Sequence, residues 1–181
     1  KKRQVKATFF SIGRDDAFSK KMYQRIVKEG HTLGMHSYSH QYKEIYQSMD
    51  AFQADYERIS NCLTAATGIK PLYYRFPGGS TEATEKLQMT DLDAYFNAQG
   101  ASYFDWNVIA ANNTTDDVSV NKMVDSVMNG VALYDTSIVL MYDSVDRKMT
   151  AKSLDSILDY LLKNGYEILP IDENTIPIHH S

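Results

Sequence analysis

Short apolar and β-branched runs alternate with longer segments of helical periodicity along the chain. Runs typical of strands lie at residues 5–12, 31–36, 72–76, 101–108, 137–142 and 166–171. Apolar positions recur at helical spacing at about 16–30, 42–66, 84–99, 120–128 and 151–164, with the first of these capped by Asp15 or Asp16. The polar stretch 112–117 is expected to be a loop. This alternation predicts an α/β protein of parallel strands with helices packed outside them.

The period alone does not separate an open doubly wound sheet from a barrel. In both, chemistry collects in the loops that follow the C-terminal ends of the strands. The polar clusters described below all occur at such positions.

Composition limits the function classes further. The 181 residues are enough for one domain with a real core, and a net charge of -4 offers no basic field for nucleic acid. The lone cysteine, Cys62, cannot form an internal disulfide. No apolar run approaches the roughly 20 residues of a membrane helix, and the first residues do not have the pattern of a signal peptide.

Two histidines follow the second predicted strand, His36 and His40 in HSYSH. At this spacing they would share one side of a helical turn and bind one metal ion. Such pairs are more often surface or capping histidines, and Ser37 and Ser39 are equally consistent with helix capping. The pair is therefore a candidate metal site that depends on its context.

Two further strand ends carry residues that suit a catalytic site. In RFPGG, Arg75 could orient a carboxylate and the N–H groups of the glycines could face an oxyanion, although a surface arginine beside a turn is the simpler interpretation. Asp105 and Trp106 close the fourth strand, where the only tryptophan is either core or the wall of a pocket.

Taken in order, the segments KATFF, GHTLGMHSYSH, RFPGG, DWN, IVLMYD and NGYEIL resemble the polysaccharide deacetylase family of NodB homology, carbohydrate esterase family 4 (CE4). The resemblance extends from Val5 to about Ile171. It implies a distorted (β/α) barrel that removes acetyl groups from glycans. It also implies a divalent metal, preferably zinc, held by two histidines and an aspartate.

The resemblance gives roles to eight residues. His36 and His40 are expected to bind the metal, Arg75 to orient the catalytic aspartate, and the main-chain N–H of Gly78 to bind the oxyanion. The remaining roles are lining of the acetyl pocket by Trp106 and Leu140, tethering of the general acid by Asp105, and the general-acid position itself at Tyr142.

Two features depart from the family pattern. The family's first motif, a TFDDG-like strand end with the catalytic base and the aspartate ligand, should precede KATFF, yet the chain begins only a few residues before that segment. Asp15 and Asp16 follow the KATFF strand but suit the start of a helix better than a metal site. Tyr142 stands where the family has histidine, and a phenol with a pKa near 10 is a poor proton donor at neutral pH.

The sequence therefore predicts a single NodB-like domain over 1–181, N-terminally incomplete, with its first strand missing from this chain. We expect a metal-dependent deacetylase of peptidoglycan or a chitin-like polysaccharide, located outside the cytoplasm or at the cell wall. The alternative is a catalytically inactive glycan-binding module of the same fold. The expected partner is the polysaccharide, and neither nucleic acid nor a membrane segment is expected.

Overall fold

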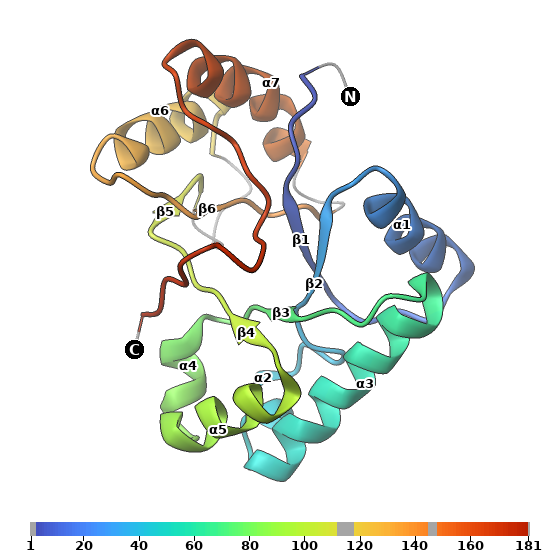
Figure 1. Ribbon diagram of the computed structural model, residues 1–181. Helices are drawn as coiled ribbons and strands as arrows, with labels where there is room; N and C mark the ends of the chain where they lie inside the picture. Colours follow the sequence, from blue (N-terminus) through green and yellow to red (C-terminus); the bar gives the residue numbers. More distant parts are fainter. Residues whose placement is uncertain (1–2, 112–117, 145–147, 181) are drawn as a thin grey trace. The chain divides into compact units, whose positions relative to one another are not determined.

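The computed structural model describes residues 3–111, 118–144 and 148–180, and the expected loop at 112–117 lies outside these ranges (Figure 1). The chain forms two compact units. The first comprises residues 1–105 and 169–181, and the second comprises residues 106–168.

The first unit is built on a parallel sheet of four strands. These are β1 (Thr8–Ser11), β2 (Thr32–Met35), β3 (Tyr73–Tyr74) and β4 (Ser102–Tyr103), paired in this order (Figure 1). Thr8 is in register with Thr32, and Met35 with Tyr74. The parallel α/β architecture predicted from the sequence is confirmed. The strands are shorter than the apolar runs, because residues at both ends of the runs lie outside the ladder.

Five helices belong to this unit, and one predicted helix is divided in two. They are α1 (Ala17–Lys28), α2 (Tyr42–Ile45), α3 (Met49–Thr67), α4 (Ser80–Thr84) and α5 (Met89–Gln99). Asp16 caps α1 by accepting a hydrogen bond from Ser19 N. The predicted helix 42–66 is wrong as one element because extended Ser48 caps a new helix, accepting from Ala51 N. The predicted helix 84–99 starts later than expected, because Gln88 is extended and α5 begins at Met89.

Aromatic side chains form the centre of the core of the first unit. Phe52 and Tyr56 of α3 contact Tyr74 of β3, with ring centroids 5.7 and 5.6 Å away, and Phe96 of α5 lies 5.6 Å from Tyr74. All four side chains are at most 2% exposed. Five of the 13 tyrosines of this chain are buried in this core: Tyr23, Tyr46, Tyr56, Tyr74 and Tyr103.

The predicted strand at 166–171 is absent from the described residues. Ile171 is instead held by two threonine side chains: its N–H donates to Thr8 Oγ1 at 2.7 Å, and its carbonyl accepts from Thr32 Oγ1 at 2.9 Å. Because hydroxyls of β1 and β2 satisfy its main chain, this segment docks without joining the ladder. Further along, the Ile178 carbonyl accepts a hydrogen bond from Asp105 N at 2.8 Å.

The second unit contains a parallel pair of strands and two helices. They are β5 (Val108–Ile109), β6 (Val139–Leu140), α6 (Val120–Val131) and α7 (Lys148–Lys163). Val127 of α6 and Ile157 of α7 are buried in its core. The predicted strand 101–108 is wrong as one element, since β4 and β5 belong to different sheets. Between β4 and β5, the Asn107 side chain makes hydrogen bonds to the main chain of Thr136 and Ile138.

No helix in the described ranges has the length and apolar character needed to cross a bilayer.

Candidate metal and catalytic site

His36 directly follows β2, and one of its ring nitrogens makes a hydrogen bond to the main chain. Its Nδ1 lies 2.7 Å from the main-chain carbonyl of Arg75, the residue that follows β3. Because a carbonyl only accepts, Nδ1 carries the proton and Nε2 keeps its lone pair. Burial lowers the pKa of His36 to about 4, so the ring is neutral near pH 7. A neutral imidazole with a fixed tautomer is the form that binds a metal ion.

His40 reaches His36 through an irregular loop, and the expected helical turn is wrong. Ser37 and His40 have φ angles of 70° and 56°, which no α-helix contains. Ser37 Oγ accepts a hydrogen bond from His40 N at 2.9 Å and closes the loop. The centroids of the two imidazole rings lie 5.1 Å apart. The loop therefore brings the rings together by a left-handed bend rather than by helical spacing.

Asp55 on α3 fixes this loop, and sequence analysis missed it. Its carboxylate accepts the N–H of Tyr38 at 2.8 Å and that of Ser39 at 2.9 Å. On the other side the Tyr38 ring lies against Gly13, where a Cβ atom would approach Tyr38 Cδ2 to 2.3 Å. An acidic residue within an amphipathic helix gives no sequence signal for such a role.

Arg75 is a buried link between β3 and β4. Its Nε donates to the Phe104 carbonyl at 2.9 Å, its Nη2 donates to the Asp105 carbonyl at 3.1 Å, and the guanidinium lies 4.3 Å from the centre of the Phe10 ring. These contacts hold the end of β4 beside the main chain that orients His36. The expected role toward a catalytic carboxylate remains a prediction.

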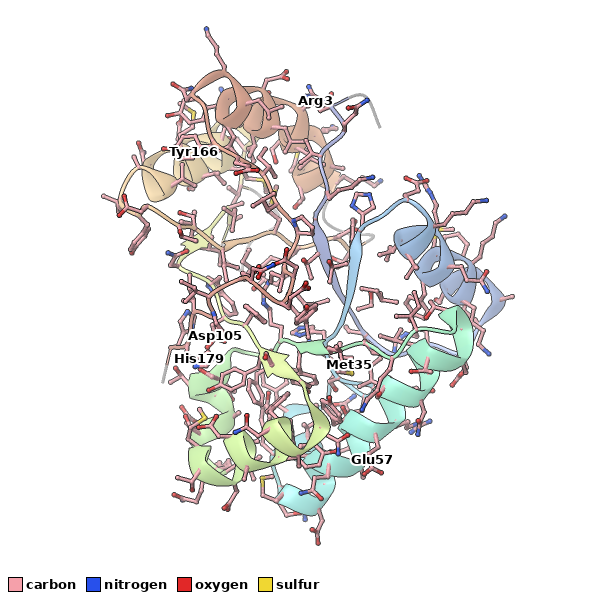
Figure 2. All side chains as sticks on the ribbon, viewed as in Figure 1. Arg3, Met35, Glu57, Asp105, Tyr166 and His179 are labelled. Atoms are coloured by element: carbon pink, nitrogen blue, oxygen red, sulfur yellow. The ribbon has the colours of Figure 1, made fainter. Side chains whose placement is uncertain are left out.

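Asp105 is fully buried and accepts three hydrogen bonds. The donors are Ser80 N at 2.9 Å and Ser80 Oγ at 2.5 Å, both at the start of α4, and His180 N at 2.8 Å. Beside it, His179 stacks on Tyr103 with ring centroids 3.9 Å apart, and Figure 2 shows Asp105 and His179 near one another. Asp105 thus joins β4, α4 and the C-terminal segment, and its role as tether of a general acid stays a prediction.

Gly78 lies in the turn between β3 and α4 with an exposed backbone. Its φ angle of 82° favours glycine, and a Cβ atom there would come within 2.9 Å of Glu82. Within the part of the chain that the structure describes, its N–H makes no hydrogen bond. An exposed N–H without a partner is available to a substrate oxygen.

The described residues contain no group of three side chains able to hold one metal ion. Asp16 is engaged with the N–H and hydroxyl of Ser19, and Asp15 accepts a hydrogen bond from the Tyr38 hydroxyl. The role of His36 and His40 as metal ligands, and the expected third ligand from a TFDDG-like motif, remain predictions.

The other three candidates belong to the second unit. Trp106 lies two residues before β5 and is half-buried. Leu140 ends β6 and is buried, and Tyr142 lies two residues after it and is half-buried. Ile109 of β5 pairs with Leu140, which places both strand ends at the same edge of this small sheet. The roles of these three residues remain predictions.

Comparison with known proteins agrees with this arrangement. The catalytic domain of a peptidoglycan N-acetylglucosamine deacetylase from Eubacterium rectale is 33% identical and superposes with a TM-score of 0.89, over 99% of this chain and 82% of that one. A CE4 esterase of Streptococcus mutans is 27% identical with a TM-score of 0.84, over 94% and 76% of the two chains. The peptidoglycan-N-acetylglucosamine deacetylase PgdA of Listeria monocytogenes is 29% identical over 96% of this chain.

The chain spans 34% of the length of that Listeria protein, and 62% and 26% of two further curated relatives. Residues 1–96, which carry the HSYSH and RFPGG segments, match the polysaccharide deacetylase family. Together with the parallel strands that bring His36 beside the Arg75 carbonyl, this match shows that the chain belongs to the polysaccharide deacetylase family.

Proposed function

We propose that this chain is the catalytic domain of a divalent-metal-dependent deacetylase acting on N-acetylated polysaccharide of the peptidoglycan or chitin type. The observation that carries the proposal is the pair of imidazoles 5.1 Å apart, one with its tautomer fixed by the Arg75 carbonyl. Relatives described as peptidoglycan deacetylases support the substrate class, and an extracytoplasmic location at the cell wall follows from that substrate.

His36 and His40 would hold the metal, for which zinc is the best match to two imidazoles and one carboxylate. When bound, such a metal supplies Lewis-acid activation of water and of the acetyl carbonyl. The Gly78 N–H donates to the carbonyl oxygen as charge develops on it, and Trp106 and Leu140 surround the acetyl methyl. Arg75 orients the catalytic carboxylate of the first motif.

Protonation of the leaving amine falls to Tyr142, with Asp105 as its tether. A phenol is a weak acid for this step at neutral pH, so the proposed enzyme is slow on amides and faster on esters, whose leaving groups need less help. The second candidate, a glycan-binding module without turnover, is favoured by one observation: Asp105 already accepts three hydrogen bonds from Ser80 and His180.

The decisive experiment is metal analysis of the full-length protein that contains this chain. We expect about one equivalent of divalent metal after dialysis, and a loss of bound metal in His36→Ala and in His40→Ala because each removes a ligand. His31→Gln is the matched control, since His31 precedes β2 at the opposite end from His36.

Equal metal content in all four proteins would refute the metal site. Deacetylation of chitotetraose by the wild type, abolished by EDTA and restored by Zn²⁺, would support the enzyme. Glycan binding without any acetate release would support the binding module.

A further inference from the structure

Neither the resemblance nor the proposed chemistry gives a role to the side chain of Tyr38, the middle residue of HSYSH. Tyr38 lies two residues from each of the two histidines that the proposed function assigns to the metal. Its half-buried side chain contacts two other segments of the first unit, at Gly13 and Asp15 after β1 and at Arg58 on α3. A side chain fixed in this way, between two candidate ligands, is suited to control how those ligands are placed.

Two groups pack against the Tyr38 ring. A Cβ atom on Gly13 would come within 2.3 Å of Cδ2 and 2.9 Å of Cγ, so the ring rests on the main chain of a residue that has no side chain. The guanidinium carbon of Arg58 lies 3.7 Å from the centroid of the ring. A cation at this distance over a tyrosine face is attracted by the ring electrons. The ring is therefore held by the loop after β1 and by α3 together.

The hydroxyl of Tyr38 is fixed as well. It donates a hydrogen bond to Asp15 Oδ2 at 2.5 Å, while Lys20 Nζ lies 3.7 Å from Asp15 Oδ1. A hydrogen bond to a carboxylate is stronger than one between neutral groups, but Asp15 is exposed and water competes for it. We therefore expect this contact to contribute about as much as one ordinary hydrogen bond.

Main-chain hydrogen bonds connect the same loop after β1 to the histidines. Gly13 N donates to the Ser37 carbonyl at 3.1 Å, and His36 N donates to the Ser11 carbonyl at 2.9 Å. Ser37 and His40 have positive φ angles, which persist only where neighbouring contacts fix them. The aromatic side chain between these two left-handed residues is the one that both neighbouring segments contact, so its removal would release the bend.

We propose that Tyr38 is a positioning residue of the metal site, whose ring and hydroxyl set the separation of the His36 and His40 imidazoles. Tyr38 acts through the main chain of the loop and binds neither the metal nor the substrate. The inference rests on the proposed function, because the metal at the two histidines belongs to that function.

The test measures the Zn²⁺ Kd of the full-length protein by competition with a chelating dye. Tyr38→Leu, which removes the ring and the hydroxyl, should raise the Kd about 10- to 100-fold. Tyr38→Phe keeps the ring against Gly13 and removes only the hydroxyl, so it should raise the Kd about five-fold, the loss of about one hydrogen bond.

Tyr95→Leu is the matched control. Tyr95 is a half-buried tyrosine of α5 whose ring packs against Phe52 and Phe96, so its replacement lowers stability without touching the histidine loop. The Zn²⁺ Kd of this variant should equal that of the wild type.

Asp15→Ala tests the hydrogen bond from the other side. It should raise the Zn²⁺ Kd by the same factor as Tyr38→Phe, and the double variant should have no larger effect than either single variant, because both changes remove one and the same contact. Additive effects would show that the hydroxyl and the carboxylate act separately and would overturn the part given to the hydroxyl.

A second measurement separates positioning from stability. With the site saturated by Co²⁺, the visible absorption bands of Tyr38→Leu should differ from those of the wild type, because the imidazoles approach the ion in a different geometry. Loss of folding stability alone does not move these bands, so Tyr95→Leu should match the wild type.

An unchanged Zn²⁺ Kd in Tyr38→Leu, an equal rise in Tyr95→Leu, or an unchanged Co²⁺ spectrum in Tyr38→Leu would overturn the positioning role. If the wild type binds neither ion, the proposed function fails instead, and ¹⁵N relaxation of the loop decides the role of Tyr38. The order parameter of the His40 N–H should then fall in Tyr38→Leu but not in Tyr95→Leu, and equal values would overturn the inference.

Discussion

The main-chain carbonyl of Arg75 sets the tautomer of His36, while the Arg75 side chain fixes the end of β4. One residue therefore contributes to the site twice, once through its backbone and once through its guanidinium. At 7% exposure the guanidinium is shielded from water, so its hydrogen bonds cannot be replaced by solvent without rearrangement.

Arg75→Lys should lower the free energy of unfolding by about 1–3 kcal/mol, because one ammonium cannot reach both carbonyls in the plane of a guanidinium. Urea denaturation measures the change. Arg25→Lys is the control, since Arg25 makes only an exposed ion pair with Glu29 on α1 and its loss costs little. Equal stability of Arg75→Lys and wild type would show that the two carbonyls do not depend on the guanidinium.

Tyr142→His should raise the rate of chitotetraose deacetylation by the full-length protein about 10- to 1,000-fold, because an imidazole has a pKa close to the working pH and a phenol does not. Acetate release measures the rate. An aryl acetate, whose leaving group needs no proton, serves as the control substrate and should gain less. Unchanged rates on both substrates would favour the glycan-binding module.

At the scale of elements, the loop that carries the histidines is held from outside by a helix. Asp55 of α3 binds two consecutive N–H groups of the loop, and the ring of Tyr38 fills the space left by Gly13. Left-handed residues such as Ser37 and His40 cost free energy, and they persist only where neighbouring contacts fix them.

Asp55→Asn should weaken metal binding by about 10- to 100-fold and lower the free energy of unfolding by about 1–3 kcal/mol, because an amide NH₂ cannot accept from a loop N–H. Metal titration and urea denaturation of the full-length protein give the two values. Asp50→Asn, an exposed change in the first turn of the same helix, should alter neither. A weakened metal site in both variants would contradict the role given to Asp55.

His31, at the opposite end of β2 from His36, makes the free energy of unfolding depend on pH. Its Nδ1 accepts the N–H of Ala7 at 3.1 Å, which requires the neutral ring, and burial together with nearby Lys6 lowers the pKa of His31. In the unfolded chain His31 binds a proton below about pH 6.5, whereas in the folded chain it binds the proton only at lower pH. The free energy of unfolding therefore falls as the pH falls towards the folded pKa.

His31→Gln should reduce the loss of stability between pH 7.5 and pH 5, because glutamine can accept the Ala7 N–H without titrating. Urea denaturation at the two pH values measures the difference, and Lys28→Gln on α1 is the control for a change of surface charge. An unchanged pH dependence in His31→Gln would assign the effect to other groups.

At the scale of the molecule, the candidate residues divide between the two units. His36, His40, Arg75, Gly78 and Asp105 belong to the first, and hydrogen bonds through main-chain carbonyls link His36, Arg75 and Asp105 in series. Trp106, Leu140 and Tyr142 belong to the second. The chain passes between units directly after Asp105, so the DWN segment contributes to both.

The sequence by itself determined the parallel α/β class, the family, and the positions of the strand ends that carry HSYSH and RFPGG. Apolar periodicity and local motifs are properties of adjacent residues, which is why they can be recognised without a fold. The same local signals were wrong about where elements begin and end. The helix predicted at 42–66 is divided because Ser48 caps a new helix, and the apolar run at 166–171 forms no strand because the main chain of Ile171 is bound by the side chains of Thr8 and Thr32.

Only the tertiary structure decided how the histidines meet and what surrounds them. The left-handed bend at Ser37 and the Asp55 carboxylate, 17 residues from Tyr38, depend on contacts between segments distant in sequence. Hydrogen bonds of this kind leave no pattern in neighbouring residues. They form once parallel strands have brought the loops after β2, β3 and β4 to the same edge of one sheet.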